Sequence, residues 1–204
     1  MEIELRNACG ANLFQPNYEK VVELLRDKDI NVNEPEVTGI FTSWTCLMIS
    51  CFYNQKDIVR FLLMDKRVNV NEVTNDGRTA FYIACRWGKA DVVKVLLGDP
   101  RIDINKSNLI RCTPIMIAYD SGYVEVLKLI LGSRREINFQ AKDNSGKNFF
   151  ERAKENPYEI EGRSLIQSLE KNVNQVRNQI RRDIGENGTL FLFVIFFHKK
   201  NLKL

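Results

Sequence analysis

The apolar residues of this chain occur in short blocks separated by polar turns, and three of these blocks are in register. Each starts at a threonine, and Thr45, Thr79 and Thr113 are evenly spaced, with a period of 34. From these residues the chain reads TCLMISC, TAFYIAC and TPIMIAY, so that apolar residues fall at the same places. Threonine is a frequent helix N-cap, and Pro114 suits the first helical position. The pattern predicts a short helix after each threonine.

A second apolar block follows each predicted helix, after a small or turn-prone residue. These blocks read DIVRFLL, DVVKVLL and EVLKLIL, and their apolar residues form one stripe on a helix of about two turns. The leading acidic residue, which is Asp57, Asp91 or Glu125, is favoured by the dipole at a helix N-terminus. Each unit closes on Val-Asn or Ile-Asn, and turn residues such as those at 75–77 suit a hairpin. Each unit is therefore predicted to be helix, turn, helix and hairpin loop.

One such unit cannot bury its apolar face alone, whereas stacked neighbours can, as in repeat proteins. The threonine block resembles the ankyrin repeat, whose signature is T-P-L-H-x-A at a period of 33. Thr79-Ala-Phe-Tyr-Ile-Ala84 and Thr113-Pro-Ile-Met-Ile-Ala118 carry the resemblance. The histidine of the signature is replaced by Met48, Tyr82 and Met116. The resemblance implies an all-α solenoid of stacked ankyrin-type units.

The period of this chain is one residue longer than that of the family. The runs Asp65–Asn69 and Asp99–Asp103 replace the family's Gly-Ala-Asp before the closing pair and carry the extra residue. Weaker copies of the unit flank the three registered ones, at residues 19–33 and from residue 146 onward, where Ile166 and Leu169 are expected on a second helix. We therefore expect about five repeats in a domain at 2–171. The approximate bounds are 2–36, 37–73, 74–107, 108–141 and 142–171, followed by a helical extension at 172–188 and an apolar and basic tail at 189–204.

The spacing of apolar residues after the repeats indicates a further helix. Ile166, Leu169, Val173, Val176 and Ile180 are spaced three and four apart in turn, as in a coiled coil. The main interpretation is one extended last helix that lies on the final repeat of a monomer. The alternative is a helix that dimerises, or binds a partner, through residues 166–184.

The apolar run at 190–197, with Lys199 and Lys200 behind it, predicts a β-prone strand or a peptide that dips into a membrane. It is equally an aggregation-prone segment or a non-native end of the reading frame. This run is too short to span a membrane, which needs roughly 20 apolar residues. A membrane association through this tail is therefore a second interpretation of the chain.

The distribution of charged residues along the chain bears on which class of partner the protein binds. The chain has 204 residues, with 30 Lys and Arg against 26 Asp and Glu, a net charge of +4. The segment 1–171 contains equal numbers of basic and acidic side chains, whereas the segment 172–204 contains six basic and two acidic ones and so holds the whole excess. Proteins that bind nucleic acid neutralise phosphates with clustered Lys and Arg. The neutral repeats argue against nucleic acid as the partner.

Residues that carry catalytic chemistry are scarce. The only histidine is His198, and Ser-His-Asp or Cys-His catalysis needs a histidine as base. The sequence contains no C-x-x-C pair and no phosphate-binding loop, so we expect neither a metal site nor a cofactor. Five cysteines, an odd number, fit a reducing intracellular setting. Cys51 and Cys85 hold equivalent helix positions and should pack internally, whereas Cys112 lies in a predicted loop and is expected to be the most exposed thiol.

The resemblance also implies where a partner would bind. In the ankyrin family, partners usually dock on the hairpin tips and on the last turn of the first helix. In this sequence those positions include both tryptophans and several of the Tyr and Arg residues that are typical of interface hot spots. An alternative for Phe41 and Trp44 is internal packing under the long loop at 34–44. The candidate contact residues are Phe41, Trp44, Phe52, Tyr53, Asn75, Asp76, Arg78, Arg86, Trp87, Leu109, Ile110 and Asp120.

The sequence therefore predicts a non-catalytic module that binds a protein partner on its concave face and hairpin tips. An intracellular adaptor, scaffold or inhibitor fits this description, with the cytoplasm as the expected location and the nucleus left open. The alternatives are a membrane-associated ankyrin protein tethered by its tail, or a fragment of a larger ankyrin-repeat protein.

Overall fold

The described part of this computed structural model comprises residues 1–10, 17–37, 39–155 and 160–186. Within those ranges the chain forms eleven α-helices and one 3₁₀ turn, and it contains no β-strand. The elements are α1 (Glu2–Ala8), α2 (Tyr18–Leu25), η1 (Gly39–Phe41), α3 (Cys46–Phe52), α4 (Lys56–Met64), α5 (Ala80–Arg86), α6 (Ala90–Leu97), α7 (Pro114–Asp120), α8 (Val124–Gly132), α9 (Phe149–Glu155), α10 (Ile160–Lys171) and α11 (Val173–Glu186). The predicted all-α class is confirmed.

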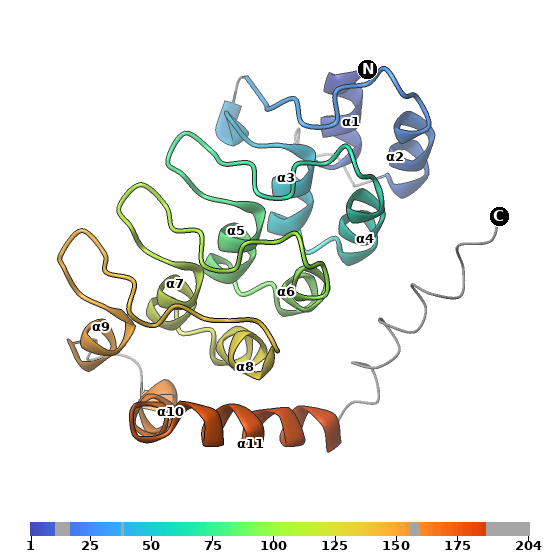
Figure 1. Ribbon diagram of the computed structural model, residues 1–204. Helices are drawn as coiled ribbons and strands as arrows, with labels where there is room; N and C mark the ends of the chain where they lie inside the picture. Colours follow the sequence, from blue (N-terminus) through green and yellow to red (C-terminus); the bar gives the residue numbers. More distant parts are fainter. Residues whose placement is uncertain (11–16, 38, 156–159, 187–204) are drawn as a thin grey trace.

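The helices stack as antiparallel pairs in a curved array. Figure 1 shows α1, α3, α5, α7 and α9 in one row and α2, α4, α6 and α8 in a second row, with the long loops projecting beside the first row. Each first helix contacts the first helix of the next pair, and each second helix from α2 to α6 contacts the next second helix. The contacts are thus between neighbours, as in a solenoid. The predicted repeat architecture is confirmed.

The helix boundaries follow the repeated residues. Thr45, Thr79 and Thr113 all lie in extended backbone immediately before a first helix, with φ of −83°, −82° and −83°. The Thr79 hydroxyl accepts a hydrogen bond from the amide of Tyr82 at 3.1 Å. Asn54 is one of the turn residues after these helices and has a φ of +58°, which is in the left-handed region. The acidic residues lie in the first turns of α4, α6 and α8, as predicted.

The core lies between the two rows of helices. Ile49, Ile83 and Val59 are completely buried, and so are Leu62 and Leu96. These residues belong to the apolar stripes that the period predicts. Burial of each such side chain contributes about 1.5–3 kcal/mol, so stacking, rather than helix propensity, holds these short helices together.

The extra residue in each period has a structural role. Arg67 pairs with Asp65, with Nη2 to Oδ2 at 2.7 Å. The same guanidinium donates hydrogen bonds to the carbonyl oxygens of Leu25 at 2.9 Å and Asp27 at 2.9 Å, at the end of α2. The last carbonyls of a helix have no partner within the helix, and a cation there also complements the helix dipole. Arg67 therefore caps the preceding unit.

The same capping contact recurs along the stack. Arg101 pairs with Asp99 and donates to the carbonyl of Leu63 in α4 at 2.6 Å. Arg135 donates to the carbonyl of Asp99, just after α6, at 3.0 Å. Arg67, Arg101 and Arg135 are spaced by the same period as the threonines, so the repeat fixes one inter-unit arginine in each of these units.

The end of the stack differs from the prediction of one extended helix. The helix is interrupted at Asn172. The side chain of this residue accepts a hydrogen bond from the amide of Gln175 at 2.9 Å and so caps the start of a separate helix, α11. Of the two last helices, α11 rather than α10 makes the extensive contact with α8. Ile166 and Leu169 are buried, but they do not form the second-row stripe expected of a fifth repeat. The apolar residues Ile166, Leu169 and Ile180 are thus buried against other parts of the same chain.

Arginines of α11 replace those of a following unit. Arg177 donates to the carbonyls of Leu131 at 2.8 Å and Ser133 at 2.6 Å, at the end of α8. Helix α11 also packs closely on Gly132, where an added Cβ would lie 2.9 Å from the Cδ1 of Ile184 and the isoleucine side chain would have to shift. Helix α11 therefore caps α8 as the next unit otherwise would. The predicted tail at 189–204 lies outside the described residues, and within them no helix has the length and apolar character to cross a membrane.

Candidate functional site

Five aromatic side chains gather beside the C-terminal end of α3, and we call them the aromatic cluster: Phe41, Trp44, Phe52, Tyr53 and Trp87. The Phe52 ring is at the centre, with centroids 5.1 Å from Tyr53 and 5.2 Å from Trp87. Phe41 and Trp44 each lie 5.7 Å from Phe52. Most of these pairs are edge-to-face, the arrangement that the ring quadrupoles favour. The cluster therefore joins the second unit to the third.

Its members differ in exposure. Trp87 is 44% exposed, whereas Phe41 is only 4% exposed. Trp44, Phe52 and Tyr53 are half-buried and pack against the core. The inclusion of Phe41 among the contact residues is corrected, because the 3₁₀ turn folds this ring under its neighbours. The alternative of internal packing holds for Phe41, and the surface of the cluster belongs to the other four rings.

Two cations flank the exposed part of the cluster. The Arg86 guanidinium carbon lies 6.0 Å from the Trp87 ring centroid, and the Lys89 Nζ lies 5.9 Å from that of Phe52. Such cation–π contacts contribute about 0.5–1 kcal/mol at exposed sites. Neither cation forms an ion pair with a carboxylate in the described part of the chain. The surface thus combines aromatic area with unpaired positive charge.

Polar contacts continue from this point along α5 toward the loops. The Tyr82 hydroxyl accepts a hydrogen bond from the Asn108 side-chain amide at 3.1 Å. Burial raises the pKa of Tyr82, so the phenol stays protonated at neutral pH. Arg78 pairs with Asp76 at 2.6 Å. Tyr82 stands where the family signature has histidine, and it provides a contact from the first helix to the next loop.

The hairpin tips are tied side by side by their backbones. The Leu109 amide donates to the carbonyl of Asp76 at 3.0 Å, and the Asn75 amide donates to the Ser43 hydroxyl at 2.9 Å. Gly77 permits this approach, because its φ is +78° and a Cβ would lie 2.8 Å from the Leu109 nitrogen. Leu109 and Ile110 are 69% and 55% exposed. The tips thus form a continuous edge that carries two exposed aliphatic residues.

Asp120 is held by an arginine of the last first-row helix. Arg152 of α9 pairs with Asp120 at 2.6 Å and also with Asp143 of the loop before α9. Burial alone would raise the pKa of Asp143, but hydrogen bonds from the Lys147 amide and from Arg152 lower it. Both carboxylates therefore share one guanidinium. Asp120 is thus already engaged within the chain, and its predicted role in contacting a partner stays a prediction.

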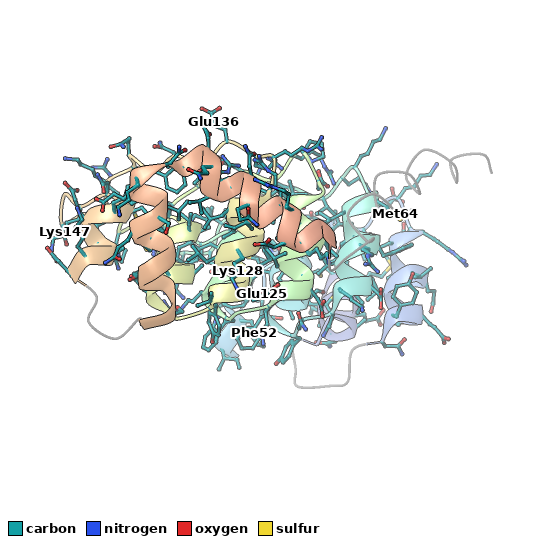
Figure 2. All side chains as sticks on the ribbon, turned by 90° about the horizontal axis from the view of Figure 1, so that it is seen from below. Phe52, Met64, Glu125, Lys128, Glu136 and Lys147 are labelled. Carbon is teal, nitrogen blue, oxygen red and sulfur yellow. The ribbon has the colours of Figure 1, made fainter. Side chains whose placement is uncertain are left out.

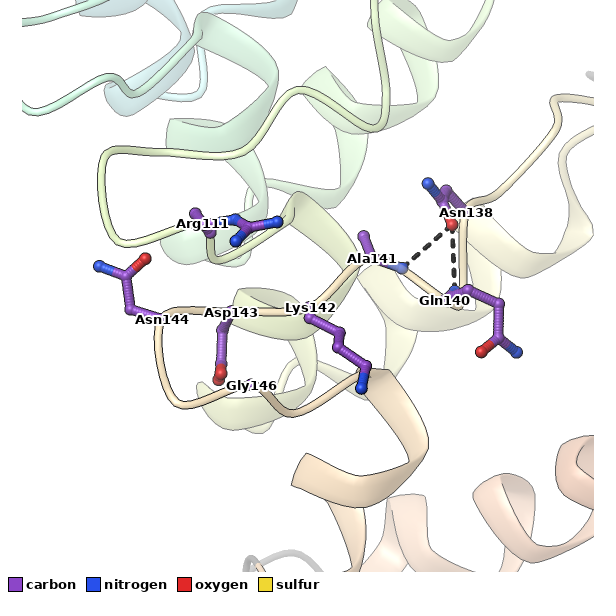
Figure 3. A pocket seen from close by; sticks show the side chains of 8 residues that line it. All are labelled: Arg111, Asn138, Gln140, Ala141, Lys142, Asp143, Asn144 and Gly146. Carbon is purple, nitrogen blue, oxygen red and sulfur yellow. Dashed lines mark hydrogen bonds between the residues drawn. The ribbon is translucent and has the colours of Figure 1, made fainter.

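A polar hollow lies next to these loops. Its volume is about 540 Å³, and it is lined by Arg111 and by residues of the loop from Asn138 to Gly146 (Figure 3). The Asn138 carboxamide oxygen accepts from the amides of Gln140 at 3.0 Å and Ala141 at 3.0 Å. Arg111 has a φ of +59°, although equivalent positions in the third and fifth units are glycines. The hollow was not predicted from the sequence.

The cysteines do not form a reactive site. All five are free and buried, and Cys112 is 1% exposed. The prediction that Cys112 is the most exposed thiol is wrong, because its side chain is buried beside the Thr113 carbonyl and the Tyr82 side chain. Burial raises the pKa of Cys112. The described residues also contain no group of three or more His, Cys, Asp or Glu side chains that could hold a metal ion.

Four cations that line or brace this face were missed by the sequence argument: Lys89, Arg111, Lys142 and Arg152. The repeat register gave one usable signal, because Arg111 falls one period after Gly77, at a position where glycine is ordinary. The other three lie outside the positions that the family pattern marks. Their contacts depend on how neighbouring units are offset.

The stacked helix pairs, neighbour-only contacts and laterally bonded loops define an all-α repeat protein. The ankyrin-repeat family model, with three copies, matches residues 8–108, about half of the chain. The chain therefore belongs to the ankyrin-repeat family, which is generally a non-catalytic protein-interaction module. No curated protein matches the sequence.

Proposed function

We propose that the protein is an adaptor or inhibitor whose partner binds over the aromatic cluster and the adjoining hairpin tips. The observation that carries this proposal is Trp87, which is exposed beside two cations without carboxylate partners. Large exposed aromatic and Arg side chains dominate the binding energy of protein interfaces. Lys- and Glu-rich solvated surfaces lack this combination.

The surface is suited to one extended docking site. Phe52 links the second unit to Trp87 of the third, and the backbone bond from Leu109 to Asp76 links the third loop to the fourth. A partner that contacts all of these groups meets a preorganised surface and orders few loops on binding. We place the site inside the cell, since five free thiols suit a reducing compartment.

The test compares capture of partners by three forms of the full chain. Trp87→Ala with Arg86→Ala should remove the specific partners that quantitative mass spectrometry finds with the wild type. Met64→Ala is the matched control, because Met64 is a large exposed apolar residue that Figure 2 shows well away from Phe52. Circular dichroism should be unchanged in both variants. Equal capture by the double variant and the wild type would refute this placement.

A further inference from the structure

We propose that the polar hollow takes a carboxylate side chain of the bound partner, so that the partner is a protein segment that carries Asp or Glu. This inference rests on the proposed function and names the chemistry that the site recognises. It starts from the charges that line the hollow and from their lack of partners within the chain.

The carboxylates of this face are already engaged. Asp76 pairs with Arg78, whereas Asp120 and Asp143 share Arg152. These pairs hold the three carboxylates of the loops around the hollow. Asp143 itself lines the hollow, but its carboxylate is held by Arg152, so none of these three carboxylates is paired with the remaining cations.

Arg111 and Lys142 are those remaining cations. Both side chains line the hollow and both are exposed. Neither forms an ion pair with a carboxylate among the described residues. Hydrogen bonds between a guanidinium or ammonium and a carboxylate are shorter and stronger than neutral ones, and Arg can hold both oxygens at once. An incoming carboxylate is the group whose charge complements these cations.

Asn138 supplies a third donor. In the earlier units the equivalent carboxamide groups bridge to the next loop, since Asn71 donates to the carbonyl of Arg101 at 2.7 Å and Asn105 to that of Glu136 at 2.9 Å. Asn138 uses its oxygen within its own loop, and its amide donor has no acceptor in the described part of the chain. It lines the same hollow. The series of inter-unit amide bonds therefore ends with a free donor beside the two cations.

The backbone at Arg111 also favours a functional explanation. The corresponding residues Gly77 and Gly146 have φ of +78° and +77°, and Arg111 has a φ of +59°. A residue with a Cβ is strained in this region, and glycine is not. Ser43, at the same position of the second unit, also has a Cβ at a positive φ, of +70°, and its hydroxyl accepts from the Asn75 amide at 2.9 Å, so a side chain at this turn can be retained for a contact that it makes.

The hollow and the aromatic cluster are linked along one path. Arg86 lies next to Trp87 and its charge acts on Tyr82, whose hydroxyl bonds to Asn108. The carbonyl of Asn108 in turn accepts from the amide of Arg111 at 2.9 Å. Neighbouring contacts thus connect the two places, and the inference places one extended segment over both, with an apolar or aromatic residue at Trp87 and an acidic one at Arg111.

The experiment pans a phage library of random dodecapeptides on the full chain. Enriched peptides are then titrated by fluorescence anisotropy against the wild type, Arg111→Gly, Trp87→Ala and Lys128→Ser. Lys128 is the matched control, an exposed lysine of α8 that is not among the residues lining the hollow. Arg111→Gly should melt at the same or a higher temperature than the wild type, because glycine accepts the backbone conformation. Loss of fold is thereby separated from loss of binding.

We expect the enriched peptides to share an acidic residue and to bind Arg111→Gly about tenfold more weakly, with Lys128→Ser within twofold of the wild type. Replacing the shared Glu or Asp by Gln or Asn should weaken binding to the wild type by the same factor and leave binding to Arg111→Gly unchanged. Such a cycle assigns the loss to one contact.

The outcomes separate the two proposals. If Arg111→Gly binds as the wild type does while Trp87→Ala is weakened, the acidic-segment inference fails and the proposed surface stands. If neither variant is weakened, or no peptide is enriched, both fail. Binding of a single-stranded RNA dodecamer that depends on Arg111, without binding of acidic peptides, would also overturn the inference.

Discussion

Removal of the Arg177 side chain should loosen the end of the stack where α11 lies on α8. Three carbonyl oxygens accept from this guanidinium, those of Leu131 at 2.8 Å, Ser133 at 2.6 Å and Arg135 at 2.7 Å. Without Arg177, two of these oxygens depend on water, and Ser133 keeps only the bond from Arg181 at 3.2 Å. The change is Arg177→Ala.

The magnitude follows from the number of bonds and their exposure. A hydrogen bond from a charged donor contributes about 1.5–3 kcal/mol when it is well buried, and these bonds are partly buried. At about 1 kcal/mol each, the three bonds contribute about 2–3 kcal/mol to the free energy of unfolding. For a chain of this size that loss lowers Tm by about 5–10 °C.

The assay is urea unfolding followed by circular dichroism, together with hydrogen exchange of the α8 amides. Arg182→Ala is the matched control, because Arg182 lies on the same helix and is exposed. Since contacts in a solenoid are between neighbours, faster exchange should begin in α11 and α8 and leave α4 unchanged. If Arg177→Ala and Arg182→Ala differ by less than about 0.5 kcal/mol, the capping role of Arg177 is refuted.

Other changes test other parts of the structure. Gly77→Ala should cost more stability than Gly146→Ala, by at least about 1 kcal/mol in thermal melts, because only the former also brings a Cβ against the next loop; equal losses would contradict the close approach. The hydrogen bond from Arg67 lowers the pKa of Asp65 in the folded chain. This pair therefore stabilises the fold fully above the unfolded pKa of 3.8, and its contribution falls as the pH drops through the lower folded pKa. Asp65→Asn should flatten the dependence of stability on pH between pH 5 and pH 2, and an unaltered dependence would exclude the pair as its cause. Burial raises the pKa of Cys112, so iodoacetamide at pH 8 should label this thiol only in denaturant, and mass spectrometry showing labelling of the folded chain would contradict its burial.

Much of the fold is determined by short stretches of sequence. Thr79 marks the start of α5, Asp91 lies in the first turn of α6 and Asn54 takes the left-handed turn, and each of these depends on a few neighbouring residues. Each of these local predictions is strengthened by repetition, because the same residue type recurs at one constant interval. This is why stacked helix pairs could be predicted from the sequence alone.

The candidate site was less predictable because its residues depend on offsets between units. Arg152 reaches back across a boundary to Asp120, and the loop before α3 folds Phe41 under Phe52. The loop position of Cys112 suggested exposure, although the side chain points inward. The sequence of a single unit does not show in which direction these side chains point. The place of α11 on α8 was missed for the same reason, since it depends on a turn at Asn172 rather than on the apolar spacing.

The inter-unit arginines also set a rule for lengthening the protein. Each of them contacts the unit before it through carbonyls at or just after the end of the preceding second helix, and two of them also pair with an acidic residue two positions earlier in their own unit. A duplicated block of exactly one period of this chain, inserted between α6 and α7, would bring its own arginine and present a fresh helix end to the next one. A consensus block with the family's shorter period would lack the added residue and interrupt the series at one joint. The chain is thus modular in steps of its own period, and spliced or designed variants that respect this length should grow without loss of stiffness.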